Sequence, residues 1–173
     1  MLFRSDLPWQ AIAYGRRAAT LIRTREIVPG MVSAAKILFR AEGMNSSLLV
    51  TEEGGLRVFY VSGKSEASSG PADMRLQRLM GHLPALLHPD PKDVLVVGFG
   101  SGVTAGSFVP YPGVRNIVVS ELEPEVPEAT SKYFHDENYG VAADRRTRFV
   151  YDDARHFILT SREKFDEIGR AHV

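Results

Sequence analysis

Two hydrophobic patterns divide this chain near residue 70. Before that point lie three runs rich in β-branched, aromatic and leucine side chains, separated by turn residues, which predicts a small antiparallel sheet. These runs are residues 36–40, 47–51 and 56–61. After the loop 68–71, apolar residues recur at helical spacing over 73–87, where Pro84 predicts a kink or a break into two short helices.

The second part of the chain alternates strand-like and helix-like segments. The apolar run at 94–97 is continuous rather than alternating, which is typical of a strand covered on both faces in a parallel sheet. Further strands are expected at 116–120 and 147–151, and helices at 103–109, 123–138 and 154–161. Such an order predicts an α/β fold with right-handed crossovers.

Residues suited to a nucleoside follow each of these three strands. Glycines from Gly98 to Gly102 permit a tight turn and a close backbone approach to a ligand. Glu121 ends the second strand, where an acid can accept hydrogen bonds from ribose hydroxyls, and Asp152-Asp153 follows the third. Because ligands bind beyond the carboxyl ends of such strands, we expect Asp153 to accept from an adenine amino group in the same site.

The glycine loop by itself leaves other readings open. It can be a simple turn, and it lacks the Lys-Ser/Thr ending of a phosphate-binding P-loop, which disfavours nucleoside triphosphates. A dinucleotide site stays open, because the glycines half-fit its fingerprint.

Composition narrows the classes of function. Lys plus Arg (21) equals Asp plus Glu (21), so charge gives no reason to expect nucleic acid as a partner. The absence of cysteine excludes disulfides and thiolate metal sites, and we expect no metal. No apolar stretch approaches the roughly 20 residues that span a bilayer, so a cytoplasmic protein is expected. A basic amphipathic pattern within 1–28 fits a membrane-surface segment or, more simply, a solvated helix.

The chain resembles a known family in several stretches, which cover most of residues 34–166. They are GHLPALLHPDPKDVLVVGFGSGVTAG, VVSELEPEV, DDARHFI and EKFD, together with AEGMNSSLLV and SSGPADMRLQRLMGH. In them the chain is similar to the polyamine aminopropyltransferases (spermidine and spermine synthases), and closest to the spermidine-synthase-like domains that bacteria fuse to membrane segments.

The resemblance implies a fold and an activity. We expect a lead-in segment (1–30), a small β-sheet domain (31–70) and a nucleoside-binding domain (71–167). The last would be the N-terminal half of a Rossmann-like domain of the S-adenosylmethionine-dependent methyltransferase type. The implied reaction moves an aminopropyl group from decarboxylated S-adenosylmethionine to a small amine. The resemblance leaves open a homodimer and a membrane tether in a longer parent.

The same resemblance assigns individual residues. Gly98, Gly100, Ser101 and Gly102 match the family's glycine loop, Glu121 its ribose-binding acid, and Asp152, Asp153 and Ala154 the segment that contacts adenine. Ser101 stands where the family usually has an aspartate, and Leu76-Gln77-Arg78 where it has Tyr-His-Glu. These departures keep two alternatives open: a methyltransferase-type enzyme with a non-polyamine acceptor, and a non-catalytic nucleoside-sensing domain. We expect a structural role for His82, which lies in an apolar helix.

The last residues have an unusual reading. In the codons ATC GGA AGA GCA CAC GTC, residues 168–173 reproduce the start of a common sequencing-library adapter. We therefore expect a non-native tail from residue 168, and we expect the family's fourth strand and its catalytic aspartate to be absent. Such a chain would be inactive and would leave strand 94–97 as an exposed edge, which predicts aggregation or a molten domain.

Overall fold

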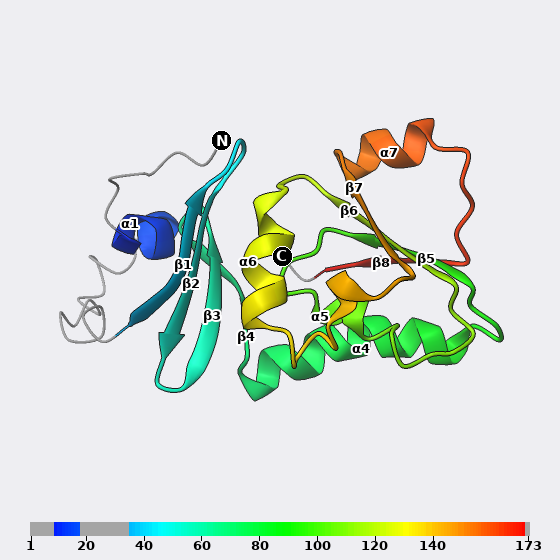
Figure 1. Ribbon diagram of the computed structural model, residues 1–173, viewed down its shortest axis with the longest axis horizontal. Coiled ribbons are helices and arrows are strands. Elements are labelled where there is room, and N and C mark those ends of the chain that lie inside the picture. Colours follow the sequence, from blue (N-terminus) through cyan, green and yellow to red (C-terminus); the bar gives the residue numbers. More distant parts are fainter. Residues whose placement is uncertain (1–8, 18–34, 172–173) are drawn as a thin grey trace.

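The computed structural model describes residues 9–17 and 35–171, which form two four-stranded sheets with a helix between them (Figure 1). The first sheet has the order β1-β2-β3-β4 and all its neighbours are antiparallel; the second has the order β7-β6-β5-β8 and all its neighbours are parallel. Both the antiparallel sheet and the α/β unit were predicted from the sequence, and both are confirmed.

The elements lie close to the predicted ranges. The first unit contains α1 (Trp9–Tyr14), η1 (Gly15–Arg17), β1 (Lys36–Glu42), β2 (Ser47–Glu53), β3 (Leu56–Val61) and β4 (Lys64–Ser68). The second contains α4 (Pro71–Leu87), β5 (Asp93–Val97), α5 (Val103–Gly106), β6 (Asn116–Glu121), α6 (Glu125–Tyr133), η2 (Val141–Ala143), β7 (Thr147–Tyr151), α7 (Ala154–Thr160) and β8 (Glu167–Arg170). Most of the predicted amphipathic segment within 1–28 lies outside the described residues.

The small sheet is covered on both faces. One face packs on α1, where Ile12 and Ala13 contact Leu49 and Tyr60. The other contributes Leu48, Val50 and Phe59 to the main core of the protein. Side chains alternate between the two faces of a strand, so the apolar run of β2 serves both.

The parallel sheet is also covered on both faces. Val94 and Val96 of β5 face the helices α5 and α6, whereas Leu95 packs with Val118 and Phe157 on the side of α7. This two-sided burial explains the continuous apolar run that the sequence shows at this strand.

Helix α6 joins the two sheets through one continuous core. Val126, Ala129 and the following Phe134 are buried in the same apolar cluster as Leu48 of the small sheet and Ile117 of the parallel sheet. The two units that the sequence predicts therefore share their principal core rather than each having one of its own.

Two predictions about helices are corrected. For Pro84 the sequence predicted a kink or a break, and the break is excluded because α4 continues through Pro84 to Leu87 as one helix. α6 ends at Tyr133 rather than at residue 138, and turns follow it to the left-handed Tyr139 and Gly140.

The expectation that strand 94–97 would be an exposed edge is wrong. β8 pairs with β5 in parallel, with Val94 opposite Glu167 and Val97 opposite Arg170. Part of the segment read as a non-native tail thus occupies the edge position. The reason is physical: backbone hydrogen bonds of a strand carry no sequence information, so an extended segment in reach can pair.

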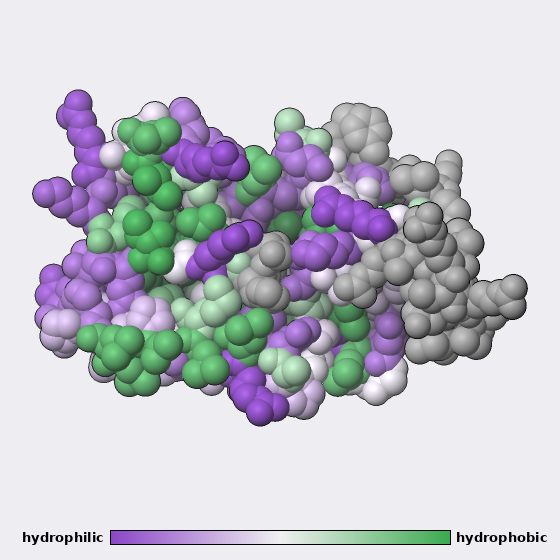
Figure 2. Space-filling view, turned by 180° about the vertical axis from the view of Figure 1, so that it is seen from behind, coloured by the Kyte–Doolittle hydropathy of each residue, from purple (hydrophilic) through white to green (hydrophobic). Residues whose placement is uncertain are grey.

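Apolar surface nevertheless remains exposed on one face of α4. Figure 2 shows hydrophobic side chains along the lower edge of the molecule, where this helix runs. The exposed members are Leu76, Leu79, Leu83, Leu86 and Leu87, at helical spacing.

Among the helices of the described ranges, none combines the length and the apolarity that a bilayer crossing needs.

The shared core gives a test of cooperativity. Leu48→Ala should lower the free energy of unfolding by about 2–5 kcal/mol, because it leaves a cavity between the small sheet and α6. Urea denaturation should still show one transition for both units. The matched control Leu159→Ala, at a side chain 83% exposed, should change stability by less than about 0.5 kcal/mol. Two separate transitions would contradict a common core.

Candidate functional site

The carboxyl ends of β5, β6 and β7 meet around a cavity of about 480 Å³. That size suits a nucleoside-sized ligand. The residues that line it are Val97, Gly98, Gly100, Ser120, Glu121, Leu122, Asp152, Asp153, Ala154, Arg155 and Arg170. Six of the eight residues predicted from the sequence are therefore gathered at one place.

The floor of the cavity is the turn after β5. Gly98 has φ +76° and Gly100 has φ +56°, backbone angles that residues with a Cβ rarely adopt. The Gly98 amide donates to the Ser120 carbonyl (2.8 Å), which holds this turn against the end of β6. The two glycines thus let the chain turn while exposing bare backbone to the cavity.

Glu121 is an acid of the cavity that is both buried and held by two backbone amides. Its side chain is buried, with Oε2 accepting from the Phe99 amide (2.7 Å) and Oε1 accepting from the Glu123 amide (2.9 Å). These charge-assisted bonds fix the orientation of the carboxylate. Each oxygen keeps a second lone pair, so two further donors can bind at the same group.

The start of α7 forms the third part of the wall. Asp153 caps this helix: its Oδ1 accepts from the amides of Arg155 (2.8 Å) and His156 (3.3 Å). Asp152 accepts from His156 Nδ1 at 2.6 Å, and this hydrogen bond lowers the pKa of the Asp152 carboxyl below its ordinary value. Ala154 follows as the first residue of the helix.

Ser101 and Gly102, also predicted as ligand contacts, do not line the cavity. Ser101 is 1% exposed, and its hydroxyl donates to Oε1 of Gln77 on α4. Gly102 lies against the ring of Phe99 and the amide of Asn138. Both residues therefore support the loop from the side that faces α4 and the interior.

Five residues that line the cavity were not predicted from the sequence: Val97, Ser120, Leu122, Arg155 and Arg170. Leu122 follows Glu121 directly, and Arg155 follows Ala154, so adjacency to the predicted residues was the available signal. Arg170 reaches the cavity because β8 pairs beside β5, which no local pattern predicted.

A second cavity, of about 500 Å³, lies at the opposite ends of the strands. Its wall includes Arg145, Arg146, Arg148 and Lys164. Arg146 already binds Asp144 and the carbonyls of Val109, Tyr111 and Val114, so its guanidinium serves the fold. We place the candidate site at the carboxyl ends, where glycine backbone and a fixed acid converge.

His82 has the structural setting predicted for it. Its Nδ1 lies 3.1 Å from the Tyr111 hydroxyl, and burial, with nearby Arg78 adding to it, lowers the pKa of the His82 imidazole. The described residues contain no group of three or more His, Cys, Asp or Glu side chains that could hold a metal ion.

Comparison with known proteins decides the family. The family model described as the spermine/spermidine synthase domain matches residues 73–170. The chain belongs to this family. It is similar to the polyamine aminopropyltransferase of Serratia proteamaculans, with 29% identity over 137 residues, 79% of this chain and 47% of that protein. The corresponding protein of Nitrosomonas europaea is 35% identical over 89 residues, 51% of this chain and 27% of that protein.

Solved structures support the same fold. A spermidine synthase in complex with the transition state analogue AdoDATO superposes with a TM-score of 0.72 and 23% identity, over 79% of this chain and 47% of that one. Spermidine synthase from Thermotoga maritima gives the same TM-score and identity. The methyltransferase-like fold expected from the sequence is thereby confirmed. The chain spans about half the length of these relatives.

The capping role of Asp153 can be tested without any ligand. Asp153→Ala should lower the free energy of unfolding by about 1 kcal/mol, because two amides of α7 lose their acceptor. Asp136→Ala, at an exposed aspartate in the turn after α6, is the matched control and should leave stability nearly unchanged. Equal effects of the two substitutions in chemical denaturation would argue against the cap.

The Asp152–His156 contact predicts a titration. In His156→Ala the pKa of Asp152 should rise toward the ordinary aspartate value of about 3.9, because its main stabilising donor is gone. The native pKa is depressed, so this contact stabilises the fold above about pH 4 and loses that effect as the pH falls through the native pKa. Carboxyl NMR measures the change; an unaltered Asp152 curve would refute this cause.

Proposed function

We propose that the cavity binds the adenosine part of decarboxylated S-adenosylmethionine, and that the function is aminopropyl transfer to a small amine. The observation that carries the proposal is the Glu121 carboxylate, which two backbone amides hold beside the glycine turn in the cavity. Membership of the spermine/spermidine synthase domain family supports it.

The geometry of Glu121 suits a ribose diol. Adjacent hydroxyls present two donors a short distance apart. Each carboxylate oxygen already accepts one hydrogen bond from an amide and has a second lone pair for a hydroxyl. A buried, pre-oriented carboxylate does not have to be ordered when the ligand binds, which favours affinity. We assign the ribose to this residue.

The wall formed by the start of α7, beside Glu121, suits the base. The first turn of α7 presents Ala154 and the Asp153 carboxylate beside the cavity. Asp153 uses Oδ1 for the helix amides, and we assign its Oδ2 to the adenine amino group. The exposed glycine backbone then lies along the sulfur side of the donor.

The reaction asks little covalent help of the protein. The donor supplies a sulfonium, which is already a good electrophile; the amine nitrogen forms a bond to the aminopropyl carbon as the carbon–sulfur bond breaks. The sulfur keeps the electron pair in methylthioadenosine, and the amine gives up a proton. What Gly98, Glu121 and Asp153 contribute is position, which can account for several orders of magnitude in rate.

A second candidate is an enzyme or a sensing domain that binds ordinary S-adenosylmethionine. The observation in its favour is that Arg155 lines the cavity. A guanidinium pairs well with the carboxylate of ordinary S-adenosylmethionine, whereas the decarboxylated donor has only an amine at that end. Ser101 also favours this second candidate, because no acid occupies its position and its hydroxyl is hydrogen-bonded to Gln77.

Further expectations complete the proposal. We propose a cytoplasmic location, a division into residues 1–30, 31–70 and 71–167, and a non-native tail at 168–173, on the codon reading given above. A homodimer and a membrane tether in a longer parent are compatible with it, and a fragment without the family's catalytic aspartate would be inactive.

Calorimetry tests the proposal. Decarboxylated S-adenosylmethionine and methylthioadenosine should bind the chain, and Glu121→Gln should weaken both by about 10- to 100-fold, because a charged acceptor contributes about 1.5–3 kcal/mol. Glu128→Gln, at an exposed glutamate on α6, is the control and should bind as the wild type does. Tighter binding of ordinary S-adenosylmethionine would favour the second candidate instead.

A further inference from the structure

Glu123 is a buried carboxylate that the site described above does not use. Only 3% of the residue is exposed, although it lies two positions after Glu121 and one after the cavity residue Leu122. A buried carboxylate is costly unless hydrogen bonds replace its water. Its partners therefore indicate what it does.

Those partners come from the turn between β1 and β2, about 80 residues away in the sequence. The amides of Met44, Asn45 and Ser46 donate to the Glu123 carboxylate at 3.3, 2.8 and 3.2 Å. Successive backbone amides pointing at one anion form a concave anion site, and here the side chain of Glu123, from the connection between β6 and α6, fills it. The Asn45 side chain also donates to the Leu122 carbonyl at 3.4 Å.

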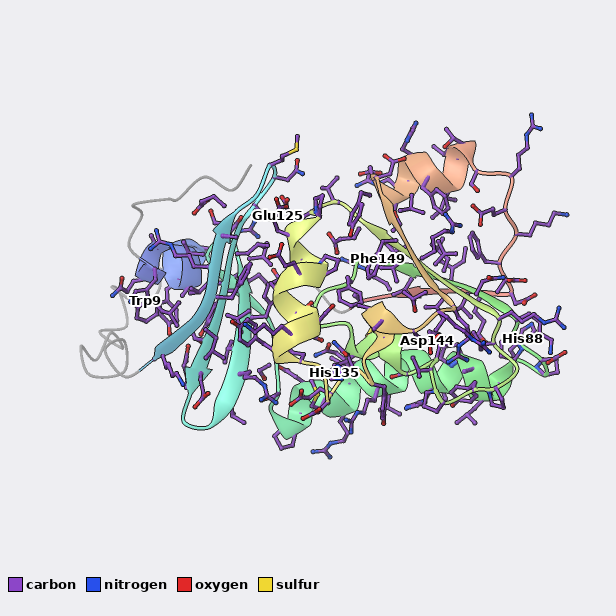
Figure 3. The ribbon with its side chains drawn as sticks, viewed as in Figure 1. Trp9, His88, Glu125, His135, Asp144 and Phe149 are labelled. Carbon is purple, nitrogen blue, oxygen red and sulfur yellow. The ribbon has the colours of Figure 1, made fainter. Side chains whose placement is uncertain are left out.

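The approach of the two segments is close enough to require glycine. A Cβ added to Gly43 would lie 2.3 Å from the carboxyl carbon of Glu123, so no other residue fits without a shift. Figure 3 shows the same proximity, with the labelled Glu125 at the start of α6 beside the tip of the β1–β2 hairpin.

The pKa shifts of Glu123 and of its neighbour Glu125 are consistent with a charged Glu123. Burial opposes the charge, but hydrogen bonds from Glu125 and from the turn amides outweigh it and lower the pKa of Glu123. The pKa of Glu125 is raised, first by its hydrogen bond to Glu123 and then by burial. Of the two carboxyls, Glu123 is therefore the one that ionises more readily.

Glu123 is connected to the cavity by its own backbone. Its amide donates to Oε1 of Glu121 (2.9 Å), and the Phe99 amide holds the other oxygen. Apolar packing already joins the small sheet to α6, but such packing is not directional. A hydrogen-bonded carboxylate instead fixes the backbone at one point of the 121–123 segment.

We infer that Glu123 is a positioning residue through which the β1–β2 turn orients the Glu121 carboxylate, so that the small sheet sets the affinity of the cavity for nucleosides. The nucleoside part of this inference rests on the proposed function. The orientation part does not, because the amide of Phe99 reports it without any ligand.

The test compares Glu123→Gln, Gly43→Ala and the control Glu128→Gln in the whole chain. Glutamine keeps the size of the side chain but turns an NH₂ group toward the donors of the turn, and alanine at residue 43 disturbs the contact from the opposite side. Amide NMR should show a shifted Phe99 resonance in the first two variants only. Their dissociation constants for methylthioadenosine should rise about tenfold.

The double variant provides the decisive comparison. Both substitutions break the same contact, that between Glu123 and the β1–β2 turn. The double variant should therefore bind only slightly more weakly than either single variant. Additive effects, or a wild-type Phe99 resonance and affinity in Glu123→Gln, would overturn the inference. If the wild type binds no methylthioadenosine, the proposed function fails, and the Phe99 resonance still decides whether Glu123 orients Glu121. Gly43→Ala keeps the test open if Glu123→Gln does not fold.

Discussion

The parallel pairing of β5 with β6 is the constraint on which this structure depends. Val97 lies opposite Ser120, so the two strands end side by side. The Gly98 amide then reaches the Ser120 carbonyl and the Phe99 amide reaches the Glu121 carboxylate. A shift of register by one residue would move Glu121 to the other face of the sheet and remove both bonds. The cavity is thus a direct result of strand register.

The second sheet has a less obvious part in the same site. Its core residues share one apolar cluster with α6, which accounts for the attachment of the two units. The polar contact at Glu123 adds direction to that attachment, next to the acid of the cavity. A small antiparallel sheet that contributes no residue to the lining of the cavity can in this way influence how a ligand binds there. The Arg57–Glu137 ion pair and the Tyr133 hydroxyl on the Leu38 carbonyl (2.6 Å) continue the interface beyond the site.

Two of the departures from the family pattern, Gln77 and Ser101, pack against each other in the interior. Gln77 on α4 is buried and takes the Ser101 hydroxyl, and its backbone carbonyl takes the Thr104 hydroxyl (3.2 Å). These contacts join α4 to the start of α5 beneath the glycine turn. Ser101 is therefore a structural residue of the loop, and the polar character at this position is directed away from the cavity.

Local sequence determined the elements and the order of the site residues. Continuous apolar runs indicated strands covered on both faces. Gly98, Glu121 and Asp153 lie at the ends of three strands, and they meet because parallel strands end at one edge. Tertiary structure alone decided the rest. Pro84 stays within one helix, β8 takes the edge beside β5, Ser101 turns to α4, and Glu123 meets a turn 77 to 79 residues away. Each of these depends on contacts between segments far apart in the chain, and hydrophobic periodicity carries no information about such partners.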